Sequence, residues 1–150
     1  MRHLEFHEEF DKVYNYFTSF GYFSDEDNFE VLKGVSRALK RGGLFLLETL
    51  NFLRIFKNFQ YRNFILGGDL VCLETTNFDP LTQRISTKRD IYKGGEKIAE
   101  RNHSIRLYTP AELEFLFKMS GMRVRNFYGS AGFEPYSENS ARLIVVAEKF

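Results

Sequence analysis

The chain has 150 residues, enough for one domain with a sizeable hydrophobic core. Hydrophobic residues make up 43% of it and aromatic residues 17%, and this composition excludes a disordered chain. The net charge of +1 gives no electrostatic reason to expect nucleic acid or an anionic membrane as a partner.

A single cysteine, Cys72, excludes an intramolecular disulfide and a cysteine-rich metal cluster. It lies in an apolar run, so we expect a small buried hydrophobic side chain. His3 and His7 lie near the N-terminus, far from His103 in the sequence, and no metal site is expected. No apolar run approaches the roughly 20 residues that span a bilayer. Residues 1–10 lack the apolar segment of a signal peptide, so we expect a cytoplasmic protein.

The first third of the chain predicts a strand, a helix and a second strand. Residues 10–16 alternate in polarity, as a strand does. Residues 25–39 predict an amphipathic helix, because Ser24 can cap its start and apolar side chains recur on one face. A Gly42–Gly43 turn should follow, and then an apolar strand over 44–50. Such a unit is typical of a parallel sheet.

The middle of the chain predicts a different architecture. Residues 52–59 have the apolar spacing of a short helix. Three segments rich in strand formers follow, at 70–78, 83–92 and 97–108, and their connections have hairpin length. We therefore expect an antiparallel β-meander. Its basic residues favour a solvated face, with a surface for an anionic substrate or RNA as the alternative.

The last third predicts a helix between two strands. A helix is predicted to begin after Thr109, because Thr109, Pro110 and Glu112 have the pattern of a capped N-terminus. Gly121 should end it. A strand is expected over 122–128, then a loop over 129–140 and a β-branched closing strand over 141–148.

Two motifs resemble those of the class I S-adenosylmethionine-dependent methyltransferases. One is the loop after the first strand, Phe17-Thr18-Ser19-Phe20-Gly21-Tyr22-Phe23. The other is Leu39-Lys40-Arg41-Gly42-Gly43-Leu44-Phe45-Leu46, similar to the family's "LKPGG.FL" with Arg41 in place of proline. The resemblance implies an α/β fold, with a partial Rossmann-like methyltransferase sheet and an inserted antiparallel β-meander. Residues 1–51 and 109–150 would form the α/β core of one truncated domain, and 52–108 the insertion.

The resemblance also implies a cofactor site. In the family, the loop after this strand passes beneath S-adenosylmethionine, and the segment similar to residues 1–6 flanks its adenine. The implied cofactor-binding residues are Met1, Arg2, Phe17, Thr18, Ser19 and Phe20. The alternative for the loop is an ordinary turn with packed aromatic side chains. Four residues could face substrate by position alone: Tyr22, Asn51, Tyr136 and Arg142. No catalytic residue is assigned, because methyl transfer often needs little beyond alignment and desolvation.

The family's glycine-rich loop and ribose-binding acid have no counterpart in this sequence. We therefore expect the C-terminal part of a methyltransferase, inactive alone, with an unassigned methyl acceptor. The alternative is a noncatalytic binding or oligomerisation module, or a truncated gene product. The strand at 10–16 would then have a free edge, and we expect homo-oligomers joined there. Apolar surface from Phe10, Val13, Phe29 or Val35 should be open beside it.

Overall fold

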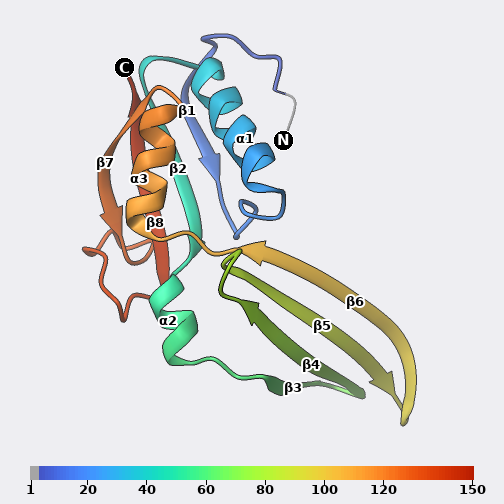
Figure 1. Cartoon of the computed structure of the whole chain (residues 1–150). Coiled ribbons are helices and arrows are strands. Elements are labelled where there is room, and N and C mark those ends of the chain that lie inside the picture. Colours follow the sequence, from blue (N-terminus) through green and yellow to red (C-terminus); the bar gives the residue numbers. More distant parts are fainter. Residues whose placement is uncertain (1–3) are drawn as a thin grey trace. The chain divides into compact units, whose positions relative to one another are not determined.

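The computed structural model describes residues 4–150 and has a mixed α/β architecture with two four-stranded sheets (Figure 1). The chain divides into two compact units. One consists of Met1–Lys57 with Leu107–Phe150 and is called the α/β unit here. The other, Asn58–Arg106, consists of strands and is called the β unit.

The sheet of the α/β unit has the strand order β1-β2-β8-β7. These strands comprise Phe10–Asn15 (β1), Leu39–Leu50 (β2), Arg142–Lys149 (β8) and Met122–Tyr128 (β7). β1 and β2 run parallel, whereas β8 is antiparallel to both β2 and β7. The predicted strands therefore form, and β1 lies at one edge of the sheet.

Two capped helices pack on this sheet, α1 (Asp25–Ala38) and α3 (Pro110–Met119). The Ser24 hydroxyl accepts a hydrogen bond from the Asp27 amide at 3.1 Å, and Thr109 forms a complete capping box with Glu112. Apolar side chains from both helices and from one face of the sheet form a single core: Val31, Leu32, Val35, Phe45, Leu47, Leu113, Phe117, Leu143 and Val145.

This packing corrects one expectation about exposed surface. Val35 is buried and Val13 packs against the core, so neither provides open apolar surface. Phe10 is exposed, as expected, and so is Tyr14. The open apolar surface therefore belongs to the sheet face that α1 and α3 do not cover.

The glycine pair after α1 also differs from the prediction. β2 begins at Leu39, directly after the helix, and Gly42 and Gly43 lie inside the strand. The register with β1 jumps from Phe10↔Leu39 to Lys12↔Leu44, so the glycines form a bulge. Gly42 has φ +76°, and a Cβ at Gly43 would lie 2.8 Å from the Lys40 carbonyl oxygen. Glycine is needed for this irregular backbone and not for a turn that precedes the strand.

The β unit is an antiparallel sheet whose strands are neighbours in chain order. They are β3 (Arg62–Gly67), β4 (Leu70–Asp79), β5 (Arg84–Lys93) and β6 (Glu96–Arg106). The sequence predicted three strands here and missed β3, because a short apolar run does not reveal its secondary structure by periodicity.

The short helix predicted after the second strand forms as α2 (Phe52–Lys57) and belongs to the α/β unit. In the described part of the chain, no helix is both long and apolar enough to cross a membrane.

Candidate functional site at the carboxyl ends of β1 and β2

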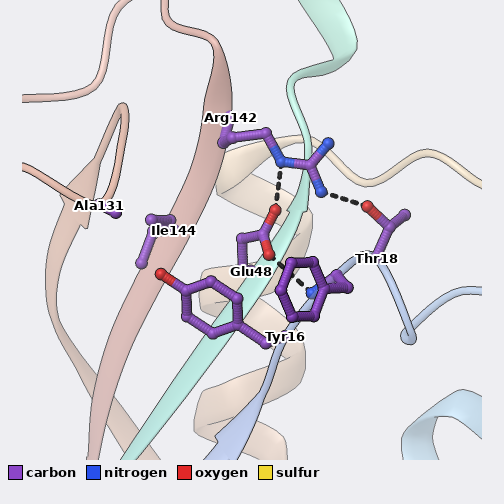
Figure 2. A pocket seen from close by; sticks show the side chains of 7 residues that line it. Tyr16, Thr18, Glu48, Ala131, Arg142 and Ile144 are labelled. Carbon is purple, nitrogen blue, oxygen red and sulfur yellow. Dashed lines mark hydrogen bonds and ion pairs between the residues drawn. The ribbon is translucent and has the colours of Figure 1, made fainter.

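A cavity of about 380 Å³ lies where the parallel strands β1 and β2 end (Figure 2). Ligands of α/β folds bind at this edge of a parallel sheet. Its lining comes from the turn after β1, the end of β2, the start of β8 and the loop before β8. The lining residues are Tyr16, Phe17, Thr18, Glu48, Ala131, Arg142 and Ile144. The cavity has the size of a small-molecule site.

Glu48 is the central polar residue of this cavity. Its side chain on β2 is almost fully buried, and one carboxylate oxygen accepts a hydrogen bond from the Phe17 amide at 2.7 Å. The other oxygen accepts a hydrogen bond from Arg142 Nε, and Arg142 Nη2 donates to the Thr18 hydroxyl (Figure 2). A buried carboxylate must be paired, and here it has both a cation and an amide.

Glu48 is not among the site residues predicted from the sequence. A signal was present, since an acid within the apolar run 44–50 requires a buried partner. The partner could not be named, because Arg142 lies 94 positions further along the chain.

The turn held by Glu48 has an uncommon backbone. Phe17 has φ 57° and Thr18 has φ 54°, so two consecutive non-glycine residues adopt the left-handed region. Each such residue costs roughly 1–2 kcal/mol. The Phe17 side chain is nevertheless 88% exposed, so it gains little from packing. Strained turns with exposed aromatic side chains at a ligand edge point to binding.

The other residues of this loop contribute to the fold. Ser19 Oγ lies 2.6 Å from the Tyr16 carbonyl oxygen and 2.8 Å from Asn15 Oδ1. Phe20 is buried against Tyr108, with ring centroids 5.4 Å apart. Phe17 and Thr18 line the cavity, whereas Ser19 braces the turn and Phe20 anchors it in the core.

Two of the four predicted substrate residues meet at a second place. The Tyr136 hydroxyl donates a 2.7 Å hydrogen bond to Asn51 Oδ1. Asn51 is buried, and its amide nitrogen donates to the Ser140 carbonyl oxygen at 2.8 Å. Burial, with a smaller contribution from Glu138, raises the pKa of the Tyr136 hydroxyl. Asn51 therefore ties the end of β2 to the loop before β8.

The remaining predicted residues are distributed differently. Arg142 lies in the cavity with Thr18, and Tyr22 is exposed. Met1 and Arg2 lie outside the described residues. Over residues 4–150, no group of three or more His, Cys, Asp and Glu side chains could hold a metal ion.

The folds of solved methyltransferases match this architecture. The chain matches the CcbJ methyltransferase of Streptomyces caelestis with TM-score 0.82 and 20% identity, over 93% of this chain and 61% of that one. It matches an S-adenosylmethionine-dependent methyltransferase of Clostridium acetobutylicum with TM-score 0.85 and 16% identity, over 99% of this chain and 61% of that one. The chain therefore has a class I S-adenosylmethionine-dependent methyltransferase-like fold, as its motifs indicated.

Among curated proteins, the sequence is similar to the cypemycin N-terminal methyltransferase of a Streptomyces species. The two are 27% identical over 127 residues, which are 83% of this chain and 51% of the relative. No family model matches the sequence. The chain thus spans about half the length of the curated relative that it matches.

A further solved relative is CalS10, an amino pentose methyltransferase from Micromonospora echinaspora whose structure has S-adenosylmethionine bound. It matches 99% of this chain with 15% identity and TM-score 0.69, and this chain covers 62% of it.

Proposed function

We propose that this chain is the C-terminal part of an S-adenosylmethionine-dependent methyltransferase. The α/β unit would be a partial Rossmann-like sheet, and the β unit an antiparallel insertion of the same truncated domain. The observation that carries the proposal is the Phe17–Thr18 turn, a strained backbone held by Glu48 and Arg142 at the carboxyl end of β1. The relatives with this fold support the same reaction class.

The cofactor would contact the chain through this turn. Phe17 and Thr18 would lie against it, while Glu48 and Arg142 keep the turn in the shape that receives it. Bound S-adenosylmethionine supplies an activated methyl group, so the protein must chiefly align acceptor and cofactor and exclude water. We place the reaction in the cytoplasm.

Activity is expected to need more than this sequence contains. The glycine-rich loop and ribose-binding acid of related enzymes provide backbone amides and a carboxylate for the cofactor. This sequence holds the strand-end loop alone, so we expect the chain by itself to be inactive.

Nuclear magnetic resonance titration tests the proposed site even at weak affinity. S-adenosylmethionine at up to 10 mM should shift the amide signals of Phe17 and Thr18 in a saturable manner, and methionine alone at the same concentration should not. A Thr18→Trp variant should lose the shifts, because the larger side chain fills the cavity next to the turn. If the cofactor leaves the amides of this turn unchanged, the proposal is wrong.

A noncatalytic module that forms homo-oligomers is the second candidate function. β1 lies at an edge of its sheet, and Tyr14 is 67% exposed on the face that α1 and α3 do not cover. A second cavity of about 330 Å³ adjoins Tyr14 and is lined by Leu44, Leu46, Phe133 and Val146, among others. In this function, a second copy of the chain would pair along Phe10–Tyr16. Light scattering on a Tyr14→Lys variant should then give a lower mass than on the unchanged chain.

A further inference from the structure

The described residues include four sheet edges, and three of them have features that discourage pairing with another chain. β1 carries Asp11 and Lys12, and extra residues of β2 interrupt the ladder between the two strands from Phe10 to Lys12. β7 and β6 also combine charged side chains with a register shift in their ladders. Charges and bulges are the usual protection of edge strands.

The fourth edge, β3, has little of either kind of protection, since its one charged residue, Arg62, lies at its start. Its residues 63–67 include no charge and no proline, and it pairs with β4 without a register shift. Every residue of β3 is exposed, including Phe64 at 63% and Leu66 at 67%. A straight, apolar and exposed edge of this kind is a template for another strand.

The backbone of β3 directs its free hydrogen-bonding groups outward at alternate residues. The Tyr61 carbonyl oxygen accepts a 2.8 Å hydrogen bond from the Thr76 amide, so residue 61 faces β4. In an antiparallel ladder, the amide and carbonyl of one residue face the same side, and the side alternates along the strand. Residues 63, 65 and 67 therefore also face β4, and the groups of Arg62, Phe64 and Leu66 face away from the sheet.

We propose that two copies of this chain form a dimer by antiparallel pairing of β3 with β3 across a two-fold axis at Ile65. This register places Phe64 opposite Leu66 of the second copy, and the outward groups of these residues exchange hydrogen bonds. It also places Arg62 beside the turn that carries Asp69 of the second copy, an acid that forms an ion pair with Lys93 of its own copy. The two sheets become one continuous eight-stranded sheet.

Side-chain packing supports the same register. Phe64 pairs with Leu73 and Leu66 pairs with Val71 across the β3–β4 ladder, so these four side chains share one face. In the dimer, Phe64 of one copy adjoins Leu66 of the other, and the two exposed apolar clusters merge. A second copy satisfies the backbone edge and the apolar side chains together, as in other strand-addition interfaces.

The first test uses the mass of the whole chain in solution. Light scattering at 100 μM should give twice the chain mass of 17.7 kDa. Leu66→Lys should reduce the mass to that of one chain, because a charged side chain would replace the apolar one that packs against Phe64 of the second copy. Ile98→Lys is the matched control: it places the same charge on the other edge strand of this sheet, at a residue that is 55% exposed, and the dimer should persist.

A cysteine placed at the proposed axis tests the register. Ile65→Cys in a Cys72→Ser background should form a disulfide-linked dimer on mild oxidation, because the two axial side chains face each other. Ile98→Cys in the same background should stay monomeric on a non-reducing gel. A monomeric unchanged chain, or a folded Leu66→Lys variant that is still a dimer, would refute the proposal. Dissociation by Tyr14→Lys alone would also refute it and would assign the contact to β1.

Discussion

At the scale of single residues, Glu48 determines the geometry of the candidate site. Its two carboxylate oxygens join three separate segments: the turn after β1, the strand β2 that carries Glu48, and the start of β8. Removing it would leave the Phe17 amide and the Arg142 guanidinium without their shared acceptor. The turn would then lose the contacts that offset its left-handed backbone.

We predict that Glu48→Ala lowers the free energy of unfolding by about 2–4 kcal/mol, because the Phe17 amide and the part-buried Arg142 guanidinium lose their acceptor. Glu48→Gln should cost less, about 1–2 kcal/mol, because the amide oxygen can still accept from Phe17. Chemical denaturation followed by circular dichroism measures both values. Equal losses for the two variants would show that the hydrogen bond to Phe17 contributes little.

The backbone at Phe17 leads to a prediction opposite to the usual effect of glycine. Phe17→Gly should leave stability unchanged or raise it by up to about 1 kcal/mol, since glycine adopts φ 57° without strain and the lost side chain is exposed. Chemical denaturation of the variant and of the unchanged chain measures the difference in their free energies of unfolding. The same variant should weaken the cofactor-dependent signal shifts. A loss above 1 kcal/mol would mean that the Phe17 ring stabilises the fold.

At the scale of elements, the sequence predicted the segments that are specified locally. The bounds of α1 and α3 follow from Ser24, Thr109 and the apolar spacing. The bulge in β2 and the strand β3 depend on pairing with distant or later residues, and local patterns do not encode that pairing. The loop after β1 was recognised by its motif, but the contact of Arg142 with Thr18 joins residues 124 positions apart.

The β unit should lose stability in acid because of one ion-pair cluster. The Lys97 ammonium, at 2.6 Å, is the main reason that the pKa of Glu100 is lowered from 4.5 to about 2. A folded-state pKa below the unfolded one stabilises the fold at neutral pH, and this contribution is lost as the pH falls from about 4.5 to about 2.

Thermal melts between pH 6 and pH 2 measure this dependence. The difference in melting temperature between the unchanged chain and Glu100→Gln should shrink as the pH falls, and added salt should reduce it at neutral pH because the group is exposed. A difference that is constant across this range would contradict the assignment.

At the scale of the whole molecule, the chain has a methyltransferase-like fold, and under our proposal it contributes part of a cofactor site. Its solved relatives extend well beyond the matched region, since this chain covers 61% of two of them. The sheet edge at β1 and the open face beside it are where further strands and helices could pack.

We expect S-adenosylmethionine to bind this chain no more tightly than about 1 mM. This sequence lacks the hydrogen bonds of the glycine-rich loop and the ribose-binding acid, which are worth roughly 1–3 kcal/mol each. Their loss would remove most of a micromolar affinity for the cofactor. Calorimetric titration with S-adenosylmethionine and S-adenosylhomocysteine measures the value. A micromolar dissociation constant for either would require a different site.

The hydrogen bonds of Asn51 have a consequence for the dynamics of the α/β unit. Its side-chain oxygen accepts from the Leu53 amide at the start of α2, and its nitrogen donates to carbonyls in the loop 137–140. Lys57 adds a 2.8 Å bond from α2 to Asn139. Both segments are thus held by the same side chain, so the opening of one removes contacts that support the other. Their amide protons should therefore exchange with solvent deuterium at a common rate, as one cooperative opening unit made of segments about 85 residues apart in sequence.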